Sequence, residues 1–370
     1  MPNEISRSKI LVGMSGGVDS SLAAALLVEA GYEVVGGFIK NWSDSKDLWT
    51  GECQWRGERR DALRVAAKLG IPLLTFDFEK EYRTRVLDRM FAEYERGLTP
   101  NPDVLCNQEV KFGLFFQEAM RLGFDAIATG HYARVVVDQQ GLVHLLKGSD
   151  PDKDQSYFLH RLSQDVLRHT LFPIGHLHKS EVREEALKRE LATANKPDSQ
   201  GICFVGKLDF HDFLRRKIAP TPGEIVTPEG TLVGQHDGLD AYTIGQRQGL
   251  KVNQDQRAWY VAGKDREHNR LIVVSDREDP LLYAKEAIIT DVHWCAVDPL
   301  AVDGSTEVEI AIRYRQPPTP AQIQSFPSPI PSLQASFYDP VWALAPGQSA
   351  VIYRGEECLG GGFLQDPTLA

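Results

Sequence analysis

The strongest restriction on the fold comes from six consecutive residues, Ser15-Gly16-Gly17-Val18-Asp19-Ser20. They follow an apolar run at 10–13 that predicts a β-strand, and they lead into a stretch at 20–30, closed by Gly31, that predicts a helix. Two adjacent glycines let several backbone N–H groups converge, the serines add hydroxyl donors, and the helix contributes its positive end. The segment therefore predicts a phosphate-binding loop. The alternative interpretation is a turn that merely caps a helix.

This loop differs from two common nucleotide-binding motifs. It lacks the Gly-Lys-Ser/Thr ending of a Walker loop and the Gly-x-Gly-x-x-Gly of a dinucleotide-binding fold. Neither a γ-phosphate transferase nor a dehydrogenase is therefore indicated.

The first two hundred residues alternate β-type runs with helix-period stretches, a pattern typical of βαβ units around a parallel sheet. Further strands are predicted at 34–39, 73–76 and 126–129, and further helices at 58–69 and 110–122. The pattern predicts a doubly wound α/β domain, and ligands of such folds bind at the carboxyl ends of the strands.

The second part of the chain reads as β structure. After about Pro220, turn signals such as Pro222-Gly223 separate short strands, which predicts a small β domain. From about Ala284 onward, alternating runs predict a second β unit, a small barrel. Residues 317–331 contain six prolines, so we expect no central strand there. The predicted domains are 1–218, 219–282 and 283–370.

Composition limits the partners and the compartment. A chain of 370 residues with 42% apolar and 25% charged residues is typical of a globular protein, and we find no signal peptide or membrane span, so we expect a cytoplasmic protein without a membrane partner. The net charge of −10 does not indicate a nucleic-acid partner, so any RNA surface must be a local patch. The candidate patches are Arg56, Arg59, Arg60 and Arg64, then 215–217, and 313–315.

The five cysteines form no Cys-x-x-Cys pair, and their odd number argues against a disulfide framework or a zinc ribbon. Cys106 and Cys203 stand in segments rich in turn-forming residues, so we expect both in exposed loops. Cys295 and Cys358 lie in or beside apolar β segments and are predicted to be small buried hydrophobes.

Two thiols that meet in space suit sulfur transfer, because one can carry a persulfide while the other attacks or resolves it. Asp103, three residues before Cys106, could exchange a proton with the substrate, or it could be a turn residue. Two rival functions remain: an amidotransferase or synthetase with the same phosphate loop, and a non-catalytic nucleotide-regulated RNA-binding protein. Neither requires paired thiols, so thiol alkylation would separate the three.

The loop resembles that of the PP-loop ATP pyrophosphatases, and nearly the whole chain resembles the bacterial tRNA-specific 2-thiouridylase family. Beyond the loop, the matching stretches are Asn41-Trp42, 101–112 (Asn-Pro-Asp-Val-Leu-Cys-Asn-Gln-Glu-Val-Lys-Phe), 128–132 (Ala-Thr-Gly-His-Tyr), 153–158 (Lys-Asp-Gln-Ser-Tyr-Phe), 196–204 (Lys-Pro-Asp-Ser-Gln-Gly-Ile-Cys-Phe), 245–247 (Gly-Gln-Arg) and 313–315 (Arg-Tyr-Arg).

The resemblance implies ATP-dependent adenylation of the wobble uridine of tRNA at its carbon-2 oxygen, followed by replacement of that oxygen with sulfur. It implies that Cys203 accepts the persulfide sulfur, Cys106 is the nucleophile and Asp103 is the acid/base. A cysteine desulfurase or a sulfur-relay protein would donate the sulfur, and Mg²⁺ is expected with ATP. The implied ATP-binding residues are Gly13, Met14, Ser15, Gly16, Gly17, Val18, Asp19, Ser20, Ile39 and Gly130, and the implied tRNA-binding residues are Asn101, Pro102, Asp103, Lys153, Asp154, Gln155, Arg313 and Tyr314.

The chain departs from the family pattern in few places. Ile39 replaces a commonly seen methionine, residues 49–57 form an idiosyncratic loop that contains Cys53, and the proline-rich stretch from Pro317 is a candidate insertion. The sequence leaves open whether Cys106 acts through a transient disulfide or assists the release of hydrosulfide.

Overall fold

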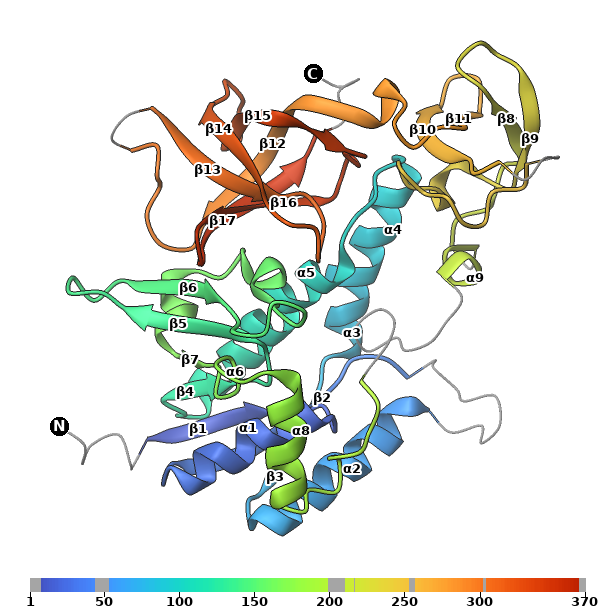
Figure 1. The fold of residues 1–370 in the computed structure, drawn as a ribbon. Coiled ribbons are helices and arrows are strands. Elements are labelled where there is room, and N and C mark those ends of the chain that lie inside the picture. Colours follow the sequence, from blue (N-terminus) through green and yellow to red (C-terminus); the bar gives the residue numbers. More distant parts are fainter. Residues whose placement is uncertain are drawn as a thin grey trace.

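The computed structural model describes residues 8–43, 53–198, 210–215, 217–252, 257–301 and 304–365. Its first domain is built on a five-stranded sheet in the order β3-β2-β1-β4-β7, in which every pairing is parallel (Figure 1). The strands are β1 (Lys9–Gly13), β2 (Glu33–Lys40), β3 (Leu73–Asp77), β4 (Ala126–Ala128) and β7 (Thr170–Leu171). This arrangement confirms the predicted doubly wound α/β domain.

Helices cover both faces of this sheet, and the alternation of side chains along β1 decides which residues meet which helices. Ile10 and Val12 pack with the helices α1 (Val18–Glu29), α2 (Gln54–Leu69) and α8 (Lys179–Lys188). Leu11 faces the other layer. That layer contains α3 (Glu79–Tyr82), η2 (Arg83–Leu87), α4 (Asp88–Glu95), α5 (Pro102–Cys106), η3 (Asn107–Leu114) and α6 (Phe115–Arg121).

The helix predicted at 110–122 is longer and less regular than expected. Helical structure runs from Pro102 to Arg121 in three segments, and the middle segment, η3, is π-helical. Its start was missed because Asn101 and Pro102 look like turn residues. In the structure Asn101 is the N-cap, and Pro102 occupies the first helical turn, where its missing N–H leaves no bond unmade.

A β-hairpin in the first domain has no counterpart among the predicted elements. Its strands are β5 (Ala133–Val137) and β6 (Val143–Lys147), and β6 pairs with the last strand of the barrel, so the hairpin extends the barrel sheet. Three further short elements follow the hairpin: η4 (Ser156–Leu159), α7 (Gln164–Arg168) and α9 (Phe210–Arg215).

The central β domain is a four-stranded sheet in the order β10-β11-β8-β9, around its own apolar core. Its elements are β8 (Gly223–Val226), β9 (Leu232–His236), η5 (Leu239–Ala241), β10 (Tyr260–Asp265), β11 (Arg270–Val274) and η6 (Pro280–Leu282). The proposed domain limits after residues 218 and 282 fall between elements.

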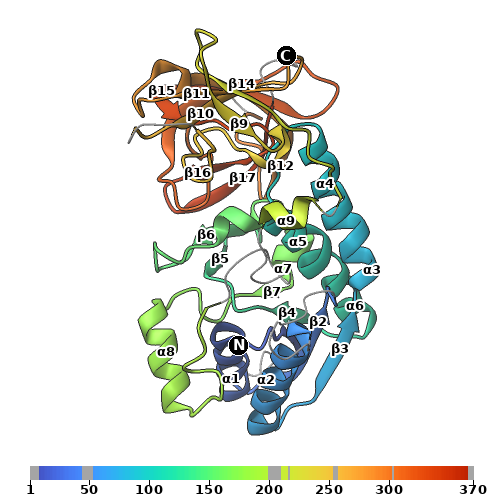
Figure 2. The same cartoon turned by 90° about the vertical axis from the view of Figure 1, so that its right-hand side faces the viewer.

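The C-terminal domain is a barrel that closes where β12 pairs with β17. This confirms the small barrel predicted for the second β unit. Its strands are β12 (Tyr283–Trp294), β13 (Ser305–Ala311), β14 (Thr319–Ser325), β15 (Ser332–Trp342), β16 (Ser349–Arg354) and β17 (Glu357–Leu364). Figure 2 shows both β domains at one end of the molecule and the parallel sheet at the other.

The expectation that 317–331 holds no central strand is wrong, because β14 pairs with both β13 and β15. Only Pro320 lies inside this strand, and it lies beyond the β15 pairing, which begins at Ala321. The other five prolines fall outside the strand, so the ladder loses little. Among the described helices, none is long and apolar enough to cross a membrane.

Candidate active site

The phosphate loop connects β1 to α1 at the carboxyl edge of the sheet. Gly16 has φ +75°, and a Cβ there would lie 2.2 Å from the Glu58 carbonyl oxygen of α2, so only glycine fits. The Ser20 hydroxyl accepts a hydrogen bond from Ser15 N–H at 3.2 Å and lies 3.2 Å from the Ser15 hydroxyl. The result is a tight turn whose N–H groups and hydroxyls gather at the positive end of α1, which suits phosphate oxygens.

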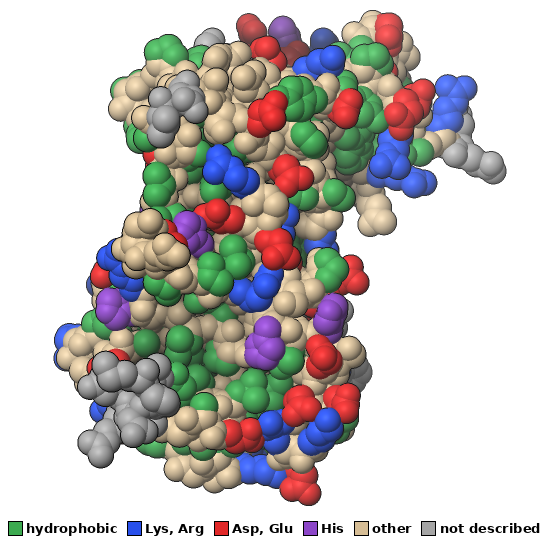
Figure 3. Space-filling model, turned by 60° about the vertical axis from the view of Figure 1, so that its left-hand side comes forward, with side chains coloured by type: hydrophobic (Ala, Val, Ile, Leu, Met, Phe, Trp, Pro, Cys, Tyr) green, Lys and Arg blue, Asp and Glu red, His purple; other side chains and the backbone are tan. Residues whose placement is uncertain are grey.

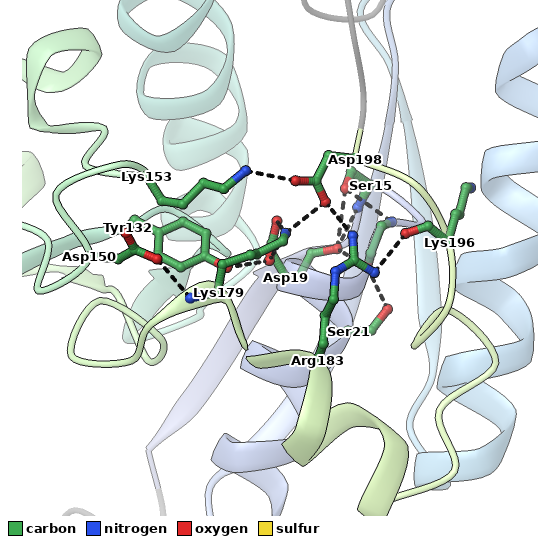
Figure 4. Close-up of polar contacts among 12 residues, drawn as sticks. Ser15, Asp19, Ser21, Tyr132, Asp150, Lys153, Lys179, Arg183, Lys196 and Asp198 are labelled. Atoms are coloured by element: carbon green, nitrogen blue, oxygen red, sulfur yellow. Dashed lines mark hydrogen bonds and ion pairs between the residues drawn. The ribbon is translucent and has the colours of Figure 1, made fainter. Parts of the chain in front are cut away.

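A lysine on α8 joins this loop to a distant part of the chain. Lys179 Nζ lies 2.7 and 2.9 Å from the two Asp19 carboxylate oxygens and 2.9 Å from Asp198 (Figure 4). The Tyr132 hydroxyl donates to Asp19 at 2.7 Å, and burial together with the Asp19 charge raises the pKa of Tyr132, so this hydroxyl keeps its proton. Asp150 accepts the Lys179 backbone N–H at 2.8 Å and so fixes the start of α8.

Asp198 collects three cations. Besides Lys179, it accepts from Lys153 Nζ at 2.9 Å and from the Arg183 guanidinium at 2.7 Å. Burial would raise the pKa of Asp198, but the hydrogen bonds from Lys153 and Lys179 outweigh burial and lower it to about 2. Asp198 is therefore a carboxylate at neutral pH, and it holds the chain just before Cys203 against the phosphate loop.

The opposite side of the loop carries a second lysine. Lys196 Nζ donates to the Gly16 carbonyl at 3.0 Å and to Asp61 on α2 at 2.7 Å. Burial raises the pKa of the nearby Glu58 carboxyl, and the Lys196 charge partly opposes this rise. Two lysines thus flank the loop, one on each side.

The other predicted ATP-binding residues lie around the same loop. Gly130 comes two residues after the end of β4 and packs against α1, where a Cβ on it would lie 2.5 Å from Ser20 N. Met14 is buried and donates its N–H to Gly37 on β2 at 2.8 Å. Ile39 is buried near the carboxyl end of β2, paired in register with Phe76 of β3. Gly13 ends β1.

The expectation that Cys106 lies in an exposed loop is wrong. Cys106 is the last residue of α5 and is fully buried in the core on that face of the sheet. The turn-forming residues before it act as a helix start: the Asn101 side chain accepts from Asp103 N at 3.1 Å and Val104 N at 3.3 Å. Asp103, by contrast, is half-buried. Cys203 lies outside the described residues.

Cys295 and Cys358 are both buried, as the sequence predicts. The Cys295 thiol donates to the His160 carbonyl at 3.3 Å, and burial raises the pKa of Cys358 well above its usual value. Both side chains pack between the first domain and the barrel.

The residues predicted to bind tRNA lie on or beside elements that contact one another. Helix α5 contacts η4, and the centroid of the Tyr314 ring lies 4.4 Å from that of Phe158 in η4. Asp154 accepts from Gly148 N and Ser156 N, and Gln155 accepts from Tyr132 N at 3.0 Å. Lys153 points to Asp198 instead.

Arg313 connects the two β domains. Its guanidinium donates to the Ile244 carbonyl at 2.6 Å and to the Ala343 carbonyl at 2.9 Å, and it lies 5.7 Å from the Trp342 ring. Figure 3 shows Lys and Arg side chains interspersed with Asp and Glu on one face, so the described residues form no continuous basic patch there.

The sequence did not single out several residues of this cluster. Tyr132, Lys196 and Asp198 lie in stretches that match the family, but no role was assigned to them, and that matching was the available signal. Lys179 and Arg183 stand on α8, and nothing in the sequence distinguishes them from the exposed cations of an ordinary helix.

Comparison with known proteins covers almost the whole chain. Three sequence families match: the tRNA methyl transferase HUP domain at 8–207, the tRNA methyl transferase PRC-barrel domain at 211–275 and the aminomethyltransferase beta-barrel domain at 284–364. The tRNA-specific 2-thiouridylase MnmA of Pseudomonas fluorescens Pf-5 is 46% identical over 368 residues, 98% of this chain and 96% of its own. That of Methylobacillus flagellatus is 48% identical over 362 residues, 97% and 99% of the two chains.

Among solved structures, the U34-tRNA thiolase NcsA from Methanococcus maripaludis is 18% identical, with a TM-score of 0.37 over 56% of this chain and 64% of its own. The identity to the two 2-thiouridylases extends over nearly the full length of both chains. The chain therefore belongs to the bacterial tRNA-specific 2-thiouridylase family.

Proposed function

We propose that this chain forms 2-thiouridine in tRNA in two steps. ATP first adenylates the carbon-2 oxygen of the wobble uridine and releases pyrophosphate. Sulfur carried as a persulfide on Cys203 then replaces the activated oxygen and releases AMP.

The observation that carries this proposal is the link from the phosphate loop through Lys179 to Asp198. Asp198 precedes Cys203 by five residues, and five residues can span at most about 17 Å. The chain length therefore limits Cys203 to within about 17 Å of Asp198, which itself binds Lys179, the lysine that contacts the phosphate loop. A structural turn would not need this arrangement, and neither would a synthetase without sulfur chemistry.

The residues present fit ATP. Gly16 keeps the loop open to the N–H groups of α1, and Lys179 and Lys196 flank it with positive charge. Asp19 and Asp198 face one point, since both lie within 2.9 Å of Lys179 Nζ, and these two carboxylates would hold Mg²⁺. Mg²⁺ would neutralise charge on the phosphates. Lys179, which lies beside the loop, would stabilise the negative charge that develops on the leaving pyrophosphate.

The sulfur step balances in either of two routes. In one, the terminal persulfide sulfur of Cys203 attacks carbon 2, AMP leaves, and the Cys106 thiolate then attacks the Cys203 sulfur, which frees the thiolated uridine. In the other, Cys106 attacks the persulfide first, and the released hydrosulfide attacks carbon 2. Both routes end with a Cys106–Cys203 disulfide, which an external thiol reductant must open before the next turnover. Asp103, on the same helix as Cys106, would exchange the proton.

The remaining roles follow the same proposal. Asn101, Pro102, Asp103, Lys153, Asp154, Gln155, Arg313 and Tyr314 would contact tRNA, and a cysteine desulfurase or relay protein in the cytoplasm would supply the persulfide sulfur.

The test is to incubate tRNA with the protein, ATP, Mg²⁺ and a persulfide source, and to measure nucleosides by mass spectrometry and ATP products by chromatography. We expect 2-thiouridine with AMP and pyrophosphate. Lys179→Ala should lose both products, whereas Lys188→Ala on the same helix should not, because Lys188 pairs with the exposed Glu184 and the half-buried Glu185, away from the loop. ADP and phosphate as products, or equal activity of the two variants, would contradict the proposal.

A further inference from the structure

We infer that the two β domains set the position of the catalytic helix α5, and that Arg266 and Lys264 of the central domain are positioning residues for this helix. The inference concerns the segment 97–99, which links α4 to α5, and it rests on the proposed function only for what α5 does. Figure 1 shows the end of α4 reaching up between the central domain and the barrel.

The central domain holds the end of α4 through its terminal carbonyl groups. Arg266 donates to the Glu95 carbonyl at 2.7 Å, and Lys264 donates to the Gly97 carbonyl at 3.1 Å. The Glu95 carbonyl lies in the last turn of α4, where carbonyls have no partner within the helix, so Arg266 satisfies a group that otherwise needs water, and Lys264 bonds the turn two residues beyond the helix. Arg266 also contacts Asp240 at 3.1 Å, which fixes its guanidinium from the domain side.

Gly97 and Arg266 lie in close contact. Gly97 has φ +82°, and a Cβ there would lie 2.3 Å from the Arg266 guanidinium. The glycine thus permits both the turn after α4 and the close approach of Arg266.

The barrel holds the next residues. Thr99 N–H donates to the Pro346 carbonyl at 2.7 Å, and its hydroxyl lies 3.5 Å from that of Thr243 in the central domain. Gly347 has φ +89°, and a Cβ there would lie 2.8 Å from Leu98 Cβ. Thr99 therefore touches both β domains at once.

A short, stiff segment joins residues 97–99 to α5. Only Pro100 separates Thr99 from Asn101, the N-cap of α5, and Pro102 follows it. Each proline fixes its own φ near −65° and restricts the residue before it, so a displacement of Thr99 passes to the helix instead of being absorbed. The helix carries Asp103 and ends at the buried Cys106.

Arg313 extends this chain of contacts. By bonding Ile244, next to Thr243, and Ala343, three residues before Pro346, it joins the two β domains at the place where they hold Thr99. A change in the seating of either β domain would therefore change how Cys106 is presented. Misplacement of a reacting group by about 1 Å can cost on the order of 100-fold in rate.

The test compares Arg266→Ala with Arg270→Ala. Arg270 is the matched control, because it is similarly exposed and in the same domain, but among the described residues its ion pair is with Glu224 of that domain. Without substrates, we measure alkylation of Cys106 by iodoacetamide, mapped by peptide mass spectrometry. Arg266→Ala should raise the rate several-fold and Arg270→Ala should leave it unchanged. In turnover, Arg266→Ala should lower kcat roughly tenfold or more, with the tRNA Kd and its salt dependence unchanged.

Unchanged Cys106 alkylation and kcat in Arg266→Ala would overturn the inference. A shallower salt dependence of tRNA binding would also overturn it, since Arg266 would then be a phosphate contact. Lys264→Met, which keeps the aliphatic stem, gives a second measurement should Arg266→Ala fail to fold, and the same result is expected from it. If the wild-type protein makes no 2-thiouridine, the proposed function fails, but Cys106 alkylation still decides whether the β domains position α5.

Discussion

At the scale of single residues, the burial of Cys106 decides how costly a substitution there is. Cys106 is fully buried among apolar side chains, so Cys106→Ser buries a hydroxyl and should lower the free energy of unfolding by about 1–3 kcal/mol. Cys106→Ala loses only a small side chain and should cost about 1 kcal/mol. Thermal or urea unfolding of both variants measures this difference, and equal stability of all three proteins would contradict the burial.

Substitutions of Cys203 and Cys106 separate the two chemical steps. If Cys203 accepts the sulfur, Cys203→Ser should take up no labelled sulfur from a desulfurase but should still release pyrophosphate with tRNA and ATP. Cys106→Ala should accumulate persulfide on Cys203 and make no 2-thiouridine. Labelled sulfur found on Cys106 in the Cys203→Ser variant would reverse the assignment.

The phosphate loop could be predicted from the sequence because the strand, the glycines and the helix start are adjacent in the chain. Lys179 and Arg183 could not be predicted, since their role depends on a contact with Asp19 or Asp198 that only the folded α8 makes. The burial of Cys106 was missed for a related reason: Asn-Pro-Asp suits both a turn and a helix N-terminus, and only packing decides between them.

At the scale of elements, Gly16 couples the phosphate loop to α2. Gly16→Ala must adopt φ +75° and also meet the Glu58 carbonyl, so it should displace α2 from the loop and abolish ATP cleavage. Gly70→Ala is the control, because Gly70 has φ +68° with nothing within 4 Å of its Cβ position. It should cost about 1–2 kcal/mol of stability from φ alone and keep activity. ATP cleavage assays of both variants decide, and activity in Gly16→Ala would count against the loop.

The β5–β6 hairpin contacts β17 through a titrating side chain. His144 bonds Glu357 at 2.5 Å and Asp138 at 3.2 Å, and the bond to Glu357, more than the one to Asp138, raises the pKa of His144 above its usual 6.5 despite partial burial. The raised pKa means that protonated His144 stabilises the folded state. This contribution to the free energy of folding is fully present below about pH 6.5 and is lost as pH rises through the folded pKa. We therefore expect the gap in Tm between wild type and His144→Gln to shrink as pH rises from 6 to 9. A gap that does not change with pH would show that the pair contributes no linkage.

Element prediction succeeded where local pattern and tertiary partner agree, as in β1, β2 and α1. The β5–β6 hairpin was not predicted because its strands are short, and the exposed Val136 and Val137 break the alternation of apolar and polar residues. β14 was excluded by counting prolines over a window, although only their positions relative to the ladder matter.

At the scale of the whole molecule, an acidic chain must bind a polyanion. Because the net charge is −10, we expect affinity for tRNA to come from locally placed cations, and on the face in Figure 3 the cations are interspersed with acids. Lys153 now neutralises Asp198 and Arg313 now bridges two carbonyls, so each would trade an internal partner for phosphate when tRNA binds. Binding energy from tRNA would thus be spent partly on loosening contacts near the phosphate loop and between the β domains.

This trade predicts how tRNA affinity depends on salt. Lys153→Ala and Arg313→Ala should each make the slope of log affinity against log salt shallower by about one unit, the value for one lost phosphate contact. Arg313→Ala should in addition lower Tm, because two interdomain hydrogen bonds disappear, whereas Lys153→Ala should change Tm little, since Asp198 keeps Lys179 and Arg183. Binding titrations at several salt concentrations, with Arg270→Ala as a charge-matched control, measure the slopes. If a variant keeps the wild-type slope, its side chain holds the protein together and does not touch the tRNA backbone.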